Sequence, residues 1–130
     1  RLCKGAYKES TEIAYQDYQE IRDNYMKNAE KIMDAGIFIG LATHDEWIIN
    51  ELENLIIKKK YKKTKYEFQA LSGVPIDNIL ERLINSGHKV RYYIPYGPEW
   101  YAYSMRRMKE NPDIWKHTLK AFFFRSKHRK

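Results

Sequence analysis

Two arginines and a glutamate near the C-terminal end of the chain have the residue types and spacing of a carboxylate-binding site. Four residues would share one face of a helix because they lie three, four and seven positions apart: Tyr103, Arg106, Arg107 and Glu110. Arg106 could then pair with Glu110, and a guanidinium held in this way suits a carboxylate ligand. A solvated helix face with a surface salt bridge gives the same pattern and is the commoner explanation of an isolated motif. The surrounding elements must decide between the two.

The length and composition of the chain are those of one packed domain spanning residues 1–130. Apolar residues make up 43% and aromatic residues 15%, which is enough for a core. The net charge is +7, but a lysine-rich linker at 58–65 holds six lysines, and the tail at 125–130 is also basic. The charge is therefore local, which argues against a nucleic-acid partner.

Other common kinds of site find little support in the sequence. Cys3 is the single cysteine, so no internal disulfide can form, and within a strand it is expected to be a small buried apolar side chain. His44 has no nearby histidine or cysteine to complete a metal site. Neither a nucleophile beside a base nor an apolar run long enough to span a membrane is found. We expect a soluble protein without a metal centre.

Apolar spacing predicts alternating strands and helices. Residues 12–35 carry apolar side chains three and four apart, as in an amphipathic helix that stops at Gly36. The continuous apolar run at 37–42 predicts a strand buried on both faces, which is typical of parallel sheets. The remaining predicted strands are 2–6, 66–71 and 89–94, and the remaining predicted helices are 45–57, 75–85, 99–110 and 113–124.

This order corresponds to the C-terminal half of a (βα)8 barrel. Four βα units in succession imply a parallel sheet with flanking helices. A complete barrel needs about 250 residues, so four units in one chain would be half of one. The chain also opens without a methionine, and we expect a fragment whose other half precedes Arg1. Alone, it should be inactive and should self-associate or bind its missing half through its open sheet edges.

In βα folds the chemistry gathers at the carboxyl ends of the strands. This rule selects segments 4–7, 43–45, 71–73 and 93–97. It places the lysine-rich linker on the opposite rim, where a solvated loop is the default interpretation.

Two of the selected segments could contact a phosphate or a flavin. At Lys4–Ala6, glycine allows close backbone approach beside a cation. Thr43 and His44 could donate hydrogen bonds to a phosphate or a ring carbonyl, although a lone histidine is more often a structural group bonded to backbone.

Five segments taken together resemble the proline dehydrogenase family, in particular its monofunctional bacterial members. They are RLCKGAY (1–7), ATHD (42–45), YEFQALSG (66–73), RYYIPYG (91–97) and YSMRRMKENP (103–112). Each is weak alone, but all five occur in order and cover nearly the whole chain. The resemblance implies a distorted βα barrel that binds FAD and oxidises L-proline to 1-pyrroline-5-carboxylate by hydride transfer to flavin N5. Positioning would then supply most of the catalysis.

The resemblance also implies a role for each candidate residue. Arg1 would be the catalytic arginine near flavin N5. The other flavin-binding residues would be Lys4, Gly5 and Ala6 along the ring and Thr43 and His44 on the ribityl-pyrophosphate side. The proline pocket would be formed by Tyr7, Leu71, Tyr93 and Tyr103. Substrate carboxylate would be bound by Arg106 and Arg107, with Glu110 orienting Arg106.

Some features of the family are absent or changed. The early barrel strands, which supply a substrate-contacting lysine and further flavin contacts, are missing, and Asp45 stands where many relatives have asparagine. The electron acceptor would be a quinone or another electron-transport carrier. We expect a location in the bacterial cytoplasm, with peripheral inner-membrane contact as an option, or in the mitochondrion of a eukaryote. The alternative function is a non-catalytic binding domain whose basic linker meets an acidic partner or a membrane surface.

Overall fold

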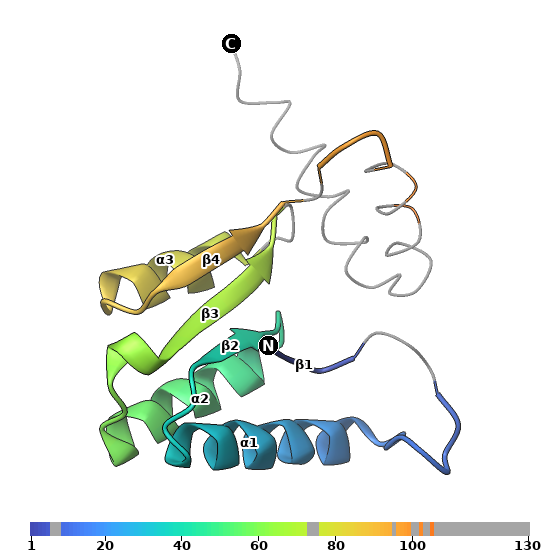
Figure 1. Cartoon of the computed structure of the whole chain (residues 1–130), viewed down its shortest axis with the longest axis horizontal. Coiled ribbons are helices and arrows are strands. Elements are labelled where there is room, and N and C mark those ends of the chain that lie inside the picture. The colour runs from blue at the N-terminus through green and yellow to red at the C-terminus, as the bar shows by residue number, and fades with distance from the viewer. Residues whose placement is uncertain (6–8, 73–75, 95, 100–101, 103–104, 106–130) are drawn as a thin grey trace.

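A computed structural model describes residues 1–5, 9–72, 76–94, 96–99, 102 and 105 of the chain. Strands and helices alternate over most of this length (Figure 1). The elements are β1 (Leu2–Cys3), α1 (Tyr18–Asp34), β2 (Ile39–Ala42), α2 (Glu46–Lys59), the short 3-10 helix η1 (Lys63–Lys65), β3 (Tyr66–Leu71), α3 (Asp77–Asn85) and β4 (Val90–Tyr93).

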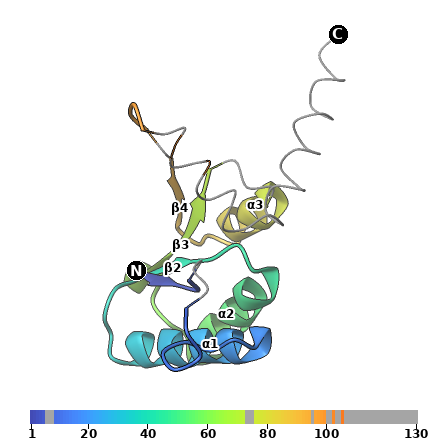
Figure 2. The same cartoon turned by 90° about the vertical axis from the view of Figure 1, so that its right-hand side faces the viewer.

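The strands form one parallel sheet in the order β1-β2-β3-β4. Leu41 lies opposite both Leu2 and Phe68, and Leu71 lies opposite Tyr93. Figures 1 and 2 show α1, α2 and α3 on one side of this sheet. No helix of the described residues covers its other side, which we call the open face. The predicted fold class is confirmed: an α/β chain with a four-stranded parallel sheet and flanking helices is part of a βα barrel.

The core lies between the sheet and its helices. On β3, alternate side chains point to opposite faces, so Tyr66, Phe68 and Ala70 pack toward the helices while Glu67 and Gln69 lie on the open face. The buried apolar residues of this core are Tyr25, Ala29, Met33, Ile39, Leu41, Ile48, Ile49, Leu52, Ile56, Tyr66, Phe68, Ala70, Leu80 and Leu83.

The first helix begins later than its apolar spacing predicted. The side chain of Asp17 accepts hydrogen bonds from the backbone of Gln19 and Glu20 and so caps α1. Before it, residues 10–14 form a separate turn in which the hydroxyl of Ser10 accepts a bond from the backbone of Glu12. A local side-chain bond thus replaces the first predicted turn of the helix.

Two burial predictions were wrong. Ile37 and Phe38 precede β2 and are half exposed, because the turn at Gly36 leads into a strand that starts only at Ile39. Cys3 is exposed, because its neighbour Leu2 takes the core side of β1 and leaves Cys3 on the open face of the sheet.

The other predicted elements agree with the structure to within a few residues. β3 spans Tyr66–Leu71 as predicted, and β4 is the central part of the predicted strand at 89–94. The predicted helix at 113–124 lies outside the described residues, as does nearly all of the predicted helix at 99–110 and the proline expected to begin α3.

Candidate functional site

Asp45 is the centre of a polar cluster at the carboxyl end of β2. Its carboxylate accepts hydrogen bonds from Lys4 Nζ at 2.9 Å, Tyr18 Oη at 2.7 Å and Arg22, which binds through Nε at 3.0 Å and Nη2 at 2.9 Å. It also caps α2 by accepting a bond from the backbone of Trp47. The cluster therefore joins the segment after β1, the start of α1 and the start of α2.

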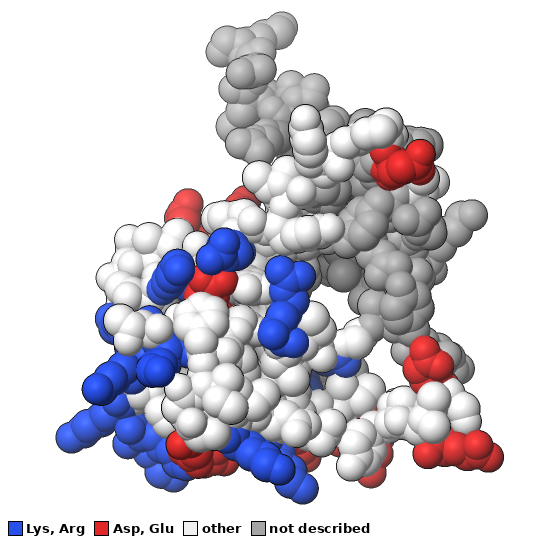
Figure 3. Space-filling model, in the orientation of Figure 1, with Lys and Arg blue, Asp and Glu red and all other residues white. Residues whose placement is uncertain are grey.

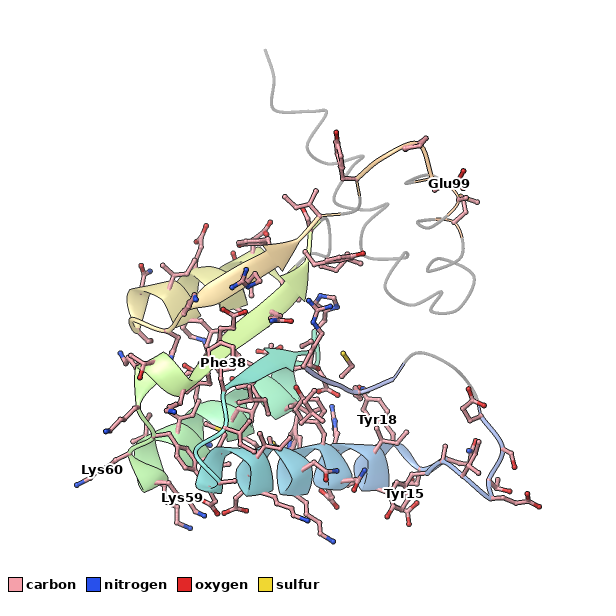
Figure 4. All side chains as sticks on the ribbon, in the orientation of Figure 1. Tyr15, Tyr18, Phe38, Lys59, Lys60 and Glu99 are labelled. Carbon is pink, nitrogen blue, oxygen red and sulfur yellow. The ribbon has the colours of Figure 1, made fainter. Side chains whose placement is uncertain are left out.

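Aromatic rings complete this cluster. Lys4 Nζ lies 3.9 Å from the centre of the Tyr18 ring, and Arg22 Cζ lies 4.3 Å from the same centre. The guanidinium of Arg22 is also 5.1 Å from the ring of Trp47. Cations over aromatic faces add to the attraction of the carboxylate. Figure 4 shows Tyr18 at the start of α1, on the side of the sheet where β1 ends.

The carboxylate of the cluster is more deeply buried than the two cations that pair with it. The Asp45 side chain is 4% exposed, whereas those of Lys4 and Arg22 keep 23% and 21% of their surface in solvent. Burial alone would raise the pKa of Asp45, but hydrogen bonds from Arg22, Lys4 and Tyr18 outweigh it and hold the pKa well below its usual range. Asp45 is therefore ionised across the physiological pH range.

His44 links the loop after β2 to the end of β3. Its Nε2 accepts a hydrogen bond of 2.8 Å from the backbone N–H of Leu71. Burial lowers the pKa of His44 and so favours the neutral ring. Because Nε2 accepts the bond from Leu71, the proton of the neutral ring is on Nδ1. The structural role that we considered for a lone histidine is thus present, and it leaves one N–H donor for another group.

The ends of β3 and β4 are tied together next to this histidine. The backbone of Ser72 donates a hydrogen bond of 2.8 Å to the carbonyl of Tyr93. Arg1, which precedes the opposite edge strand, places its Cζ 5.9 Å from the centre of the Tyr93 ring. The sheet is therefore curved enough to bring side chains from its first and last strands together at the open face.

A second ion cluster lies further down the open face. Glu67 on β3 binds Arg91 through both carboxylate oxygens and also accepts from Gln69 and pairs with Lys89. Its side chain is 2% exposed. The hydrogen bond from Arg91 lowers the pKa of Glu67 to about 2 despite the opposing effect of burial. Gly40 makes room for the cluster, because a Cβ there would clash with the side-chain amide nitrogen of Gln69.

The structure brings part of the predicted site together. Arg1, His44, Leu71 and Tyr93 meet at the carboxyl ends of β2, β3 and β4, whereas Lys4 and Thr43 lie in or beside the Asp45 cluster. Gly5 follows Lys4 with a φ of +89°, a conformation that favours glycine, and a Cβ there would meet no described atom within 4 Å. The predicted residues outside the described part are Ala6, Tyr7, Tyr103, Arg106, Arg107 and Glu110.

Sequence reasoning missed the residues that hold Lys4 in place. Asp45 was predicted to open a helix and to belong to the strand-end segment 43–45, and Tyr18 was predicted to lie in the helix at 12–35. Neither was expected to contact the Lys4 ammonium, as both do. The available signal was the spacing of Tyr18 and Arg22, which places a ring and a cation on one helix face, together with a carboxylate directly after a strand end.

The described residues contain neither a metal-ligand cluster nor a helix that could span a membrane. No group of three or more histidine, cysteine, aspartate or glutamate side chains there could hold a metal ion. Among those same residues, the helices are too short or too polar to cross a bilayer.

The fold and the position of the polar residues define a protein of the βα-barrel class. The family profile described as "Proline dehydrogenase" matches residues 1–118. Over 112 residues the chain is 38% identical to "Proline dehydrogenase" of Deinococcus radiodurans and to "Proline dehydrogenase 2" of Bacillus subtilis strain 168. The chain belongs to the proline dehydrogenase family.

The match is extensive for this chain and partial for its relatives. It covers 86% of this chain, but 36% of the Deinococcus protein and 37% of the Bacillus protein. The chain thus spans little more than a third of the length of these curated relatives. Proline dehydrogenases are oxidoreductases, and the resemblance inferred from the sequence motifs is confirmed at the level of the family.

Proposed function

We propose that the chain is the C-terminal half of a barrel in which FAD oxidises L-proline to 1-pyrroline-5-carboxylate. It would contribute its part of the site at the carboxyl ends of its strands. The observation that carries the proposal is the meeting of Arg1, His44, Leu71 and Tyr93 at one edge of the sheet, in a chain of the proline dehydrogenase family. These residues come from segments far apart in the sequence, and carboxyl ends of parallel strands are where βα barrels place their chemistry.

The donors at this edge fit the chemistry of a flavin. The guanidinium of Arg1 lies 5.9 Å from the centre of the Tyr93 ring, and its N–H groups are donors suited to an electron-rich ring. His44 retains an Nδ1–H donor because Nε2 accepts from Leu71. Gly5 offers backbone with open space beside it. We assign the following residues to the flavin: Arg1, Lys4, Gly5, Ala6, Thr43 and His44.

The bound flavin would supply the oxidation, by accepting a hydride from C5 of proline while the amine loses a proton. The residues of the chain would bind and orient the substrate. In this proposal Arg106 and Arg107 bind the proline carboxylate, Glu110 orients Arg106, and aromatic and aliphatic side chains enclose the ring. The pocket residues would be Tyr7, Leu71, Tyr93 and Tyr103. A quinone or another electron-transport carrier would reoxidise the flavin.

A comparison of two substrates tests the carboxylate clamp, by which we mean Arg106 and Arg107. The protein is purified as its gene encodes it, and its turnover of L-proline is compared with that of pyrrolidine, which has the same ring without the carboxylate. Arg106→Ala and Arg107→Ala should each raise the KM for proline about 10-fold to 100-fold, because a charge-assisted hydrogen bond to the carboxylate is lost. Turnover of pyrrolidine should change little.

The matched control is Arg125→Ala, which removes an arginine from the basic tail beyond the part that matches the family. It should leave the KM for proline unchanged. Equal losses for proline and pyrrolidine in both clamp variants would indicate a general structural defect and would contradict the assignment. Unchanged turnover of proline in both would contradict it as well.

A further inference from the structure

Two of the segments that we assign to the flavin directly follow β1 and β2. The paired residues nearest to them are Cys3 and Ala42, where the ladder between the two strands ends. Beyond this pair, the described parts of segments 4–6 and 43–44 belong to neither a strand nor a helix. The sheet therefore does not by itself fix these two segments relative to each other, and that role falls to side chains.

Asp45 joins the two segments through its side chain and its backbone. Its carboxylate accepts a hydrogen bond from Lys4 Nζ at 2.9 Å, and its backbone N–H donates to the hydroxyl of Thr43 at 3.1 Å. Lys4 lies one residue beyond the paired part of β1, and Thr43 lies one residue beyond that of β2. Asp45 thus continues the connection between the two strands past the last pair of the ladder.

Two residues of α1 hold this carboxylate in one orientation. Arg22 binds both of its oxygens and Tyr18 donates a further hydrogen bond, and the Asp45 side chain is 4% exposed. The Lys4 ammonium also lies over the ring of Tyr18, 3.9 Å from its centre. A buried carboxylate with several charged and polar donors has little freedom to rotate. Lys4 is therefore bound to a fixed partner.

Helix capping alone does not explain the charge of Asp45. The cap of α2 uses one hydrogen bond of 3.2 Å, from the backbone of Trp47 to Oδ1. A neutral asparagine caps a helix about as well as aspartate does. The negative charge serves Lys4 and Arg22, which both pair with it. The carboxylate therefore has a second role, which is to hold the cation next to Gly5.

We propose that Asp45 is a positioning residue for the flavin, which holds Lys4, and with it the backbone of Gly5, in the conformation that the cofactor binds. Gly5 has a φ of +89° and open space beside it, so its backbone can approach a ring once the segment is fixed. A segment that is ordered before the cofactor arrives loses less entropy on binding. This inference rests on the proposed flavin site, and it assigns to Asp45 an effect through Lys4 alone.

The rate at which FAD leaves the protein tests this role. The protein is purified as its gene encodes it with its flavin bound, and release after dilution is followed by the fluorescence of free FAD. Asp45→Asn keeps the helix cap and removes the charge. It should release FAD about 10-fold faster, because a charge-assisted hydrogen bond is lost. Lys4→Met removes the other partner of the same pair and should have an effect of similar size.

The double variant separates positioning from two independent effects. Asp45→Asn combined with Lys4→Met should release FAD only about 10-fold faster than the unmodified protein, like either single change, because Asp45 acts through Lys4. Lys4→Arg keeps the cation and should restore slow release when residue 45 is aspartate, but not when it is asparagine. Release about 100-fold faster in the double variant would show that the effects are independent and would overturn the proposal, as would unchanged release in Asp45→Asn.

The chain offers a matched control at the other end of the sheet. Asp34 accepts hydrogen bonds from Lys59 and Tyr61, so the same three residue types meet there. Figure 3 shows Lys and Arg side chains gathered at that end of the molecule, where α2 ends, and Figure 4 shows Lys59 well away from Tyr18. Asp34→Asn should leave FAD release unchanged. An acceleration equal to that of Asp45→Asn would show that the loss of any such carboxylate loosens the flavin, and the positioning role would be wrong.

The same measurements separate a failure of the positioning role from a failure of the proposed function. If the unmodified protein holds FAD and the changes at Lys4 and Asp45 act independently, the flavin site stands and the positioning role is wrong. If the unmodified protein neither retains FAD on purification nor binds added FAD, the proposed function is wrong and the positioning role fails with it.

Discussion

The two ends of the sheet carry cations in opposite settings. At the carboxyl ends, Lys4 and Arg22 share one buried carboxylate and lie against the ring of Tyr18. At the amino ends, four lysines are exposed and have no side-chain partner among the described residues: Lys58, Lys60, Lys62 and Lys65. The first arrangement fixes side chains in position, whereas the second leaves charge free for a partner surface. Composition alone would count these cations as equivalent.

Removing the shared carboxylate should have the largest effect on stability. Asp45→Ala should lower the free energy of unfolding by about 3 kcal/mol, because it leaves two partly buried cations and the first turn of α2 without their acceptor. Urea denaturation measures the loss. As the control, Asp34→Ala removes an exposed carboxylate that pairs with Lys59 and should cost only a small fraction of that loss, because solvent screens exposed ion pairs. Equal losses would contradict the distinction between the two ends.

The hydrogen bond from Leu71 to His44 should have the next largest effect. His44→Leu removes the acceptor of a backbone N–H at the end of β3, which should cost about 1–3 kcal/mol. Native-state hydrogen exchange measures this locally: the Leu71 amide should exchange faster, while the amide of Phe68, bonded to the carbonyl of Lys89, should keep its protection. An unchanged Leu71 amide would show that another group satisfies it.

The ion cluster on the open face should make stability depend on pH. Glu67 has a folded pKa of about 2, below its ordinary value of 4.5, so its contribution to stability is complete above pH 4.5 and is lost as the pH falls toward 2. Glu67→Gln should therefore be less stable than the unmodified protein by about 1–2 kcal/mol at pH 7, with the difference vanishing near pH 2. Glu81→Gln, an exposed change on α3, should show no such pH-dependent difference. A pH-independent difference for Glu67→Gln would contradict the ion-pair explanation.

The smallest effect on stability is expected at the exposed lysines between α2 and β3. Lys62→Gln combined with Lys65→Gln should change the free energy of unfolding by less than about 0.5 kcal/mol, since both side chains are exposed and lack partners in the described part. Thermal denaturation measures it. A loss as large as that of Asp45→Ala would mean that these two lysines have a structural role.

The sequence was sufficient to predict the parallel βα order, because buried strands and amphipathic helices have distinct apolar periods. β3 was predicted to the residue. Helix starts and strand starts were less predictable. The start of α1 depends on the side-chain bond of Asp17, and the burial of Ile37 and Phe38 depends on where β2 joins the sheet.

For the site, the carboxyl-end rule selected Lys4, His44, Leu71 and Tyr93 correctly as neighbours of that edge. It did not predict that Asp45 would join Lys4 to Tyr18 and Arg22, because that contact depends on how α1 packs beside β1 and not on local spacing. The pairing of Glu67 with Arg91 depends on how β3 is aligned with β4, and this alignment cannot be read from the sequence of either strand alone.

The central claim is that this edge of the sheet is half of a flavin site for proline oxidation. Anaerobic addition of L-proline to the protein, purified as its gene encodes it with its flavin bound, tests the claim most directly. We predict that the absorbance of the oxidised flavin disappears with a saturable dependence on proline, and that Arg106→Ala shifts the dependence to higher proline concentration. A bound flavin that stays oxidised at every proline concentration would contradict the claim.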